Sequence, residues 1–187
     1  MTVPKPPLSP LDFHAKQAKL FSDHLDGLRD DSTVVLKAHL LIEEMCRDFC
    51  SGAVANPAHL RNARFSFNHV VKLTRALCPM ESGNFEYIWT VISQLTAMRN
   101  QLAHELEPDG LTFESHRISI IDSVSRRQAV GGSDEPAERL AGALSFVLGA
   151  LSAWLAVSMA MLRDKESGLS PSEHVHELGL LSLPPDQ

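Results

Sequence analysis

A cation, an amide and an imidazole stand within six residues of one another in the segment Arg99-Asn100-Gln101-Leu102-Ala103-His104. An arginine offers a planar fork of donors to a phosphate, and an imidazole can accept and return a proton near neutral pH. These residue types suit phosphoryl chemistry, with His104 as general acid or base and Arg99 as the group that binds the anion.

Helical spacing decides which of these side chains can meet. Residues five apart differ by about 140° around an α-helix, so Arg99 and His104 do not share a face, whereas Asn100 and His104, four apart, do. We therefore expect Asn100 to orient the imidazole while the long side chain of Arg99 reaches toward the same space. The alternative is structural: a histidine cation stabilises the C-terminal end of a helix, and the arginine pairs with a carboxylate.

Two further residues are candidates for supporting this site. His39 and Glu43 lie four apart and share one face of a predicted helix. Glu43 is the expected partner of Arg99 through a charge-assisted hydrogen bond. The alternative is that both residues serve only helix packing.

A basic surface is predicted between Leu60 and Met80, where the sequence contains no carboxylate. If the segment is one helix, four cations fall within a narrow arc and become candidates for binding RNA: Arg61, Arg64, Lys72 and Arg75. A solvated face balanced by acids elsewhere explains the same residues, and no aromatic platform for bases is obvious beside them.

The elements that must position these residues are helices. Apolar residues recur at helical spacing throughout the chain, and strands have almost no support. Helices are predicted over residues 9–27, with Ser9 as cap; 32–52, with Asp31 or Ser32 as cap; a turn after Pro57; 65–77; 84–108, with Asn84 as cap; 111–127; and 136–165. This pattern predicts an all-α, single-domain helical bundle over 9–166, with a flexible N-terminus (1–8) and a polar C-terminal tail (167–187).

The last predicted helix is unusually apolar, because residues 140–162 carry no charge. The stretch is long enough to cross a bilayer. It also contains small residues such as Gly142 and Gly149, which let neighbouring helices approach closely, and no other segment resembles a membrane span. We favour a long, buried C-terminal helix over a membrane span.

The composition and charge of the chain limit the classes of function that it can have. The net charge of −6 argues against a protein that coats nucleic acid indiscriminately. The odd number of cysteines, Cys46, Cys50 and Cys78, suggests reduced thiols in a cytoplasmic protein, and the N-terminus lacks the apolar run of a signal peptide.

No cofactor is predicted, since the sequence has no glycine-rich phosphate loop. No metal is predicted either, because the tail that carries Glu173, His174, His176 and Glu177 offers no rigid scaffold.

Residues 95–104, read as Leu-Thr-Ala-Met-Arg-Asn-Gln-Leu-Ala-His, resemble the signature of the HEPN superfamily, in which an arginine, a polar residue, a few more positions and a histidine occur in a helical bundle. Arg64 and His69 have the same separation but depart from this pattern, because Phe65 follows Arg64. Residues 37–45 and 67–77 are similar to helices of the branch that includes the mannitol operon repressor and related bacterial proteins. The resemblance covers roughly residues 32–108.

The resemblance implies metal-independent RNA cleavage, in a site that catalytic members of the superfamily usually share across a homodimer. His104 would be the acid or base, Arg99 would stabilise the phosphorane, and Asn100 would orient His104. A toxin-like ribonuclease restrained by an antitoxin or regulatory partner is the leading expectation. The alternative is a non-enzymatic transcriptional regulator or protein-interaction module of the same fold, similar to the mannitol repressor branch.

Overall fold

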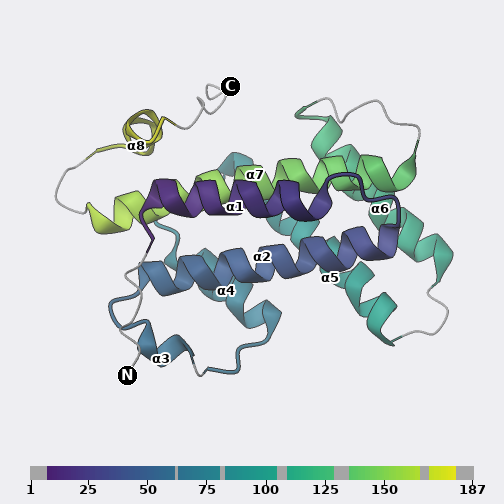
Figure 1. Cartoon of the computed structure of the whole chain (residues 1–187), viewed down its shortest axis with the longest axis horizontal. Helices are drawn as coiled ribbons and strands as arrows, with labels where there is room; N and C mark the ends of the chain where they lie inside the picture. Colours follow the sequence, from purple (N-terminus) through teal and green to yellow (C-terminus); the bar gives the residue numbers. More distant parts are fainter. Residues whose placement is uncertain are drawn as a thin grey trace. The chain divides into compact units, whose positions relative to one another are not determined.

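The protein is described here by a computed structural model that covers residues 8–61, 63–80, 83–104, 109–128, 135–164 and 169–179. These residues form helices and no strand, which confirms the all-helical prediction (Figure 1). The helices are α1 (Pro10–Leu25), α2 (Asp31–Ala53), α3 (Ala58–Arg61), α4 (Phe67–Leu77), the 3-10 helix η1 (Gly83–Phe85), α5 (Glu86–His104), α6 (Gly110–Ser125), α7 (Pro136–Arg163) and α8 (Pro171–Glu177).

The starts of the first two helices follow from polar side chains that bind backbone amides. Ser9 Oγ accepts from the Asp12 amide at 3.1 Å, as predicted. At α2, the carboxylate of Asp30 accepts from the Thr33 amide at 2.7 Å, so Asp30 is the cap rather than Asp31 or Ser32. The sequence could not separate the three residues, because all are good caps.

The basic segment is not one helix. α3 ends at Arg61, and Ser66 begins α4 by accepting from the His69 amide. The arc predicted for the four cations therefore does not exist, because Arg64 lies in the connection between two helices. Lys72 and Arg75 remain three residues apart on α4.

Within the residues that the structure describes, the chain divides into two compact units. Unit 1 comprises Met1–Ala18, Glu43–Glu81 and Ser152–Gln187, and unit 2 comprises Lys19–Ile42 and Ser82–Leu151. α1, α2 and α7 each contribute one part to each unit. The prediction of a single domain over 9–166 stays a prediction.

Unit 1 is held together by polar bonds as well as by apolar packing. His14 Nδ1 of α1 lies 2.8 Å from Ser152 Oγ of α7, and Lys16 Nζ lies 2.6 Å from Asp48 Oδ2 of α2. α2 also buries Met45, Phe49 and other apolar residues completely. These contacts hold the short α1 segment of this unit against α2 and α7.

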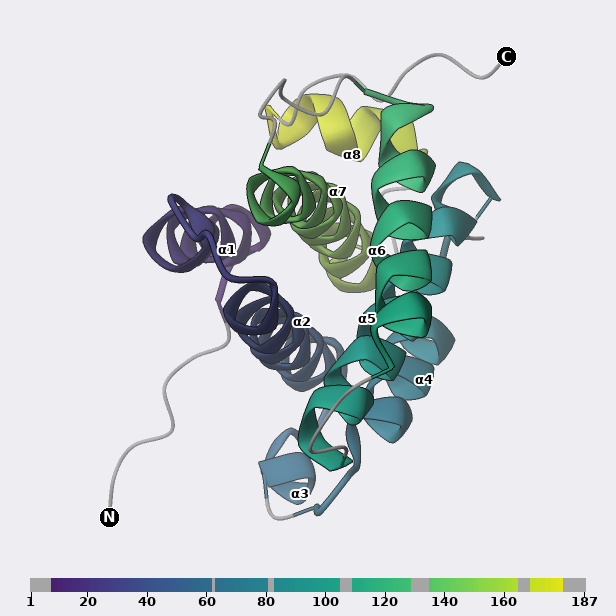
Figure 2. The ribbon, with the colours of Figure 1, turned by 90° about the vertical axis from the view of Figure 1, so that its right-hand side faces the viewer.

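Unit 2 is organised by the hairpin of α5 and α6, which pack against each other (Figure 2). The guanidinium of Arg127 lies 3.9 Å from the centre of the Tyr87 ring, and Gln94 Nε2 donates to Ser119 Oγ at 2.6 Å. Because residue numbers rise along one helix as they fall along the other, the two helices are antiparallel. The C-terminal end of α5 therefore lies at the same end of the hairpin as the start of α6.

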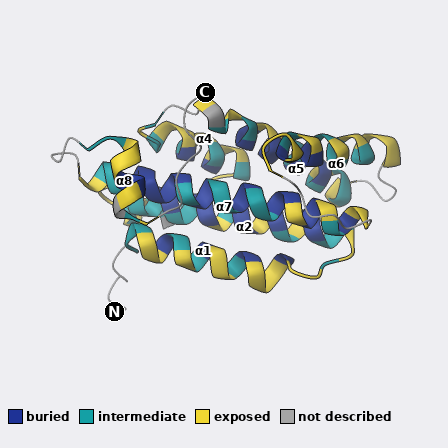
Figure 3. Ribbon diagram, turned by 90° about the horizontal axis from the view of Figure 1, so that it is seen from above, coloured by how far each residue is buried: buried dark blue, intermediate teal, exposed yellow. Residues whose placement is uncertain are grey.

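α7 is the apolar helix that the sequence singled out. Within the described residues it is the one helix long and apolar enough to cross a membrane, and 67% of its most apolar window is buried (Figure 3). The core helix of a soluble protein meets the same criterion, and this burial is compatible with our preference for a core helix.

α7 is not C-terminal, which corrects one prediction. α8 follows it within the segment predicted as a polar tail, where Ser170 and Glu173 form a capping box. His174 and Val175 are buried, at 2% and 7% exposure. A capping box is a local signal for the start of a helix, and the prediction of a polar tail did not take it into account.

Candidate active site

α5 carries all three residues of the predicted site. Its apolar side buries Ile92, Leu95 and Met98, which anchors the helix in unit 2. Arg99 directly follows the buried Met98 and is half-buried, whereas Asn100 is exposed. His104 is the last residue of α5 and is also exposed. The prediction that Asn84 caps this helix falls on a side chain outside the described residues.

The arginine and the amide are joined directly. Arg99 Nη1 donates to Asn100 Oδ1 at 3.2 Å. Within the described part of the chain, which omits residues 105–108, no hydrogen bond or ion pair engages the His104 imidazole. The orienting bond from Asn100 to His104 stays a prediction, and the amide oxygen of Asn100 is committed to Arg99 instead.

The start of α6 lies at the same end of the hairpin as His104. Asp109 caps α6 by accepting from the Leu111 amide and from the Thr112 hydroxyl. These hydrogen bonds, chiefly that from Thr112, hold the pKa of the Asp109 carboxyl below its ordinary value. Asp109 is therefore an anion whose lone pairs are engaged by its own helix.

A second polar cluster ties α6 to the start of α2 within unit 2. Arg117 donates to Asp31 at 3.1 Å and lies 2.5 Å from Glu114. Burial raises the pKa of Asp31 above its ordinary value despite the opposing effect of Arg117. The carboxylate of Glu114 is thus paired within α6.

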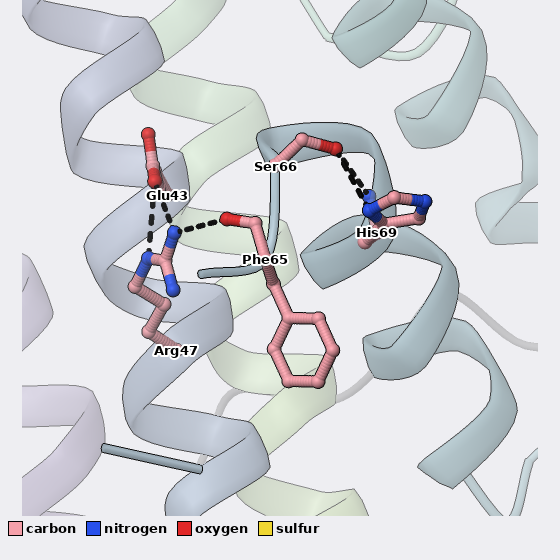
Figure 4. A network of polar contacts seen from close by, with 5 residues as sticks. All are labelled: Glu43, Arg47, Phe65, Ser66 and His69. Atoms are coloured by element: carbon pink, nitrogen blue, oxygen red, sulfur yellow. Dashed lines mark hydrogen bonds and ion pairs between the residues drawn. The ribbon is translucent and has the colours of Figure 1, made fainter. Parts of the chain in front are cut away.

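The two supporting candidates have separate environments. Glu43, which belongs to unit 1, accepts from Arg47 Nε at 3.0 Å and from Nη2 at 2.7 Å (Figure 4). The predicted ion pair between Glu43 and Arg99 stays a prediction. His39, which belongs to unit 2, is buried at 6% exposure and takes part in polar or ring contacts.

The candidate RNA-binding cations all belong to unit 1. Arg64, Lys72 and Arg75 are exposed, and the side chain of Arg61 lies outside the described residues. Sequence reasoning missed Arg47, which lines a cavity of unit 1 together with Phe65. Its spacing of four residues from Glu43 is a local signal for the ion pair, whereas its contact with the connection before α4 depends on tertiary structure.

Burial keeps the thiols of unit 1 protonated. Cys50 Sγ lies 3.4 Å from Thr74 Oγ1, and burial raises the pKa of Cys46 to about 12 and that of Cys78 to about 11. All three are free thiols. Their protonated state makes them poor nucleophiles. Among the residues with described placement, no group of three or more metal-ligating side chains could hold an ion.

Comparison with known proteins adds no relative. No family model matches the chain, and no match was found among curated proteins or among solved structures.

Proposed function

We propose that the protein is a metal-independent endoribonuclease of the HEPN type, in which Arg99 and His104 act on the RNA phosphate. The observation that carries the proposal is the end of α5, where a half-buried guanidinium and an exposed imidazole stand on one well-anchored helix. The resemblance of residues 95–104 to the superfamily signature supplies the reaction class.

In the proposed reaction, the ribose 2′-oxygen attacks the adjacent phosphorus and the bond from phosphorus to the 5′-oxygen breaks. The 2′-hydroxyl proton passes to a base, and an acid protonates the departing 5′-oxygen. The products are a 2′,3′-cyclic phosphate and a 5′-hydroxyl. Arg99 stabilises the negative charge that accumulates on the pentacoordinate phosphorus.

His104 is the proposed group for one of these proton transfers. A single imidazole cannot take the first proton and donate a second one at the same moment, so a concerted reaction needs a second acid or base. A homodimer would provide it, because His104 of the partner subunit can take the complementary role. Regulation by an antitoxin-like partner is part of the same proposal.

The test is cleavage of a fluorescent single-stranded RNA by pure protein in the presence of EDTA. We expect a product ending in a 2′,3′-cyclic phosphate, and we expect His104→Ala to reduce the rate by at least about 100-fold, the scale of general acid–base catalysis. The matched control is His24→Ala, which removes an exposed histidine from the last turn of α1. Equal rates for wild type and His104→Ala would refute the assignment.

A second candidate function is a non-enzymatic interaction module. It is favoured by large apolar side chains that are exposed on α6, namely Leu111 at 85% and Ile118 at 49%. Exposed apolar side chains of this kind are typical of protein-contact surfaces when they gather on one face. Failure to cleave any RNA, together with tight binding of a protein partner that Leu111→Ser abolishes, would favour this function.

A further inference from the structure

We propose that unit 1 contains a binding pocket for one unpaired pyrimidine base of single-stranded RNA. The inference rests on the proposed RNA-directed function, but it concerns residues other than Arg99 and His104. The pocket is lined by residues of α2, α3, the connection before α4, and α4 itself: Arg47, Cys50, Ser51, Leu60, Phe65 and Val70.

The size of the pocket suits one six-membered ring. Its volume is about 130 Å³. One water occupies about 30 Å³ of the liquid, and an engineered cavity of about 150 Å³ holds a single benzene. The pocket therefore has room for one six-membered ring, and because it is open on one side, the second ring of a purine would lie outside its walls.

The walls carry the groups that recognise a base. Phe65 is 37% exposed and supplies an aromatic face on which a base can stack. Arg47 Nη1 and the Ser51 hydroxyl make no hydrogen bond to any described residue, so both remain able to bond to the carbonyl oxygens and ring nitrogens of a base. Stacking on an aromatic side chain with hydrogen bonds to the base edge is the usual way in which unpaired bases are bound.

The pocket is preformed by bonds between its walls. Arg47 Nη2 of α2 donates to the Phe65 carbonyl at 2.9 Å, and Glu43 holds the same guanidinium from the other side (Figure 4). Ser66 Oγ lies 3.1 Å from His69 Nδ1, which fixes the turn that follows Phe65. A base that enters such a site loses less free energy to ordering the protein than it would in a loose one.

Two exposed cations are the candidates for contacting the phosphates of the bound RNA. Arg64, which directly precedes Phe65, and Lys72, two residues after Val70 on α4, are exposed, and the sequence from residue 60 to residue 80 contains no carboxylate. The RNA backbone on either side of a bound base would therefore meet positive charge.

The experiment measures binding of 2′-O-methyl oligonucleotides by fluorescence anisotropy, since these lack the free 2′-hydroxyl and cannot be cleaved by the proposed reaction. We expect the wild-type protein to bind a 12-residue oligouridine about tenfold more tightly than the oligoadenine of the same length. Phe65→Ala should remove this preference, and Phe65→Leu, which keeps an apolar side chain to maintain folding, should remove it as well. Leu36→Ala, at a side chain that is 43% exposed, is the control for an exposed apolar residue, and it should leave the preference unchanged.

Lys72→Gln separates the phosphate contact from the base contact. It should weaken binding of both oligonucleotides equally and reduce the salt dependence of the dissociation constant. Equal affinity for the two oligonucleotides, or a uridine preference that survives both Phe65 substitutions, would overturn the pocket assignment. Binding with uridine preference but without cleavage of natural RNA would refute the proposed catalysis and leave the pocket standing.

Discussion

Arg99 Nη1 donates to the amide oxygen of its neighbour Asn100 at 3.2 Å. Adjacent residues on a helix diverge by about 100°, so this bond requires the arginine side chain to curl across the helix surface. In the proposed nuclease, Asn100 is therefore a positioning residue for the guanidinium. The sequence had predicted a different role, orientation of His104.

The first prediction is that Asn100 acts through Arg99. Asn100→Ala should slow RNA cleavage by about tenfold, the scale expected for one charge-assisted hydrogen bond. In an Arg99→Lys background the same substitution should have little further effect, because the fork that it positions is absent. The measurement is a double-mutant cycle on kcat/KM. Independent effects of the two substitutions would instead support action of Asn100 on His104.

The second prediction concerns Arg47. Arg47→Met should lower the free energy of unfolding by about 1–2 kcal/mol, because it removes the bonds to Glu43 and to the Phe65 carbonyl while preserving much of the apolar stem. The loss is small for hydrogen bonds of a charged group because water screens the Arg47 side chain, which is 40% exposed. Urea unfolding measures the change. Arg64→Met, at an exposed position, is the matched control and should alter stability by less than about 0.5 kcal/mol.

The third prediction is a pH dependence of stability. Burial lowers the pKa of His14 below 6.5, so the unfolded chain binds a proton at this residue more readily than the folded one. The stabilising contribution of neutral His14 should be fully present above pH 6.5 and should be lost as the pH falls through its folded pKa. Protonation also requires Ser152 Oγ, 2.8 Å away, to act only as an acceptor.

The measurement is the urea midpoint of wild type and His14→Gln at pH 7.5 and pH 5.5. The wild type should lose more stability on acidification than His14→Gln, whose side chain does not titrate. His24→Gln, which removes an exposed histidine, should retain the wild-type loss. An identical pH response of wild type and His14→Gln would contradict the prediction.

The fourth prediction tests α7 as a core helix. Leu144 is fully buried, and Leu144→Ala should lower the free energy of unfolding by about 2–5 kcal/mol through lost apolar contact and the cavity left behind. Leu111→Ala, at a side chain that is 85% exposed, should change it by less than about 0.5 kcal/mol. Both unfolding curves are recorded in detergent-free buffer. Similar effects of the two substitutions would argue against burial of this face of α7.

The sequence alone determined the helical class and most helix positions, because apolar periodicity and capping are local properties. Ser9 begins α1 as predicted, and the segments around Met45, Leu95 and Leu144 are helices with buried apolar sides. The position of Arg99, Asn100 and His104 near the end of α5 was equally readable. These features depend on residues within a few turns of one another.

Tertiary structure decided which side chains become partners. The guanidinium of Arg47, which pairs with Glu43 one helical turn away, also reaches the backbone carbonyl of Phe65, eighteen residues further along the chain. His174 is buried although its surroundings in sequence are polar. The bond to the Phe65 carbonyl and the burial of His174 depend on how separate segments pack against one another. The apolar periodicity of a single helix does not show which other segment it will contact.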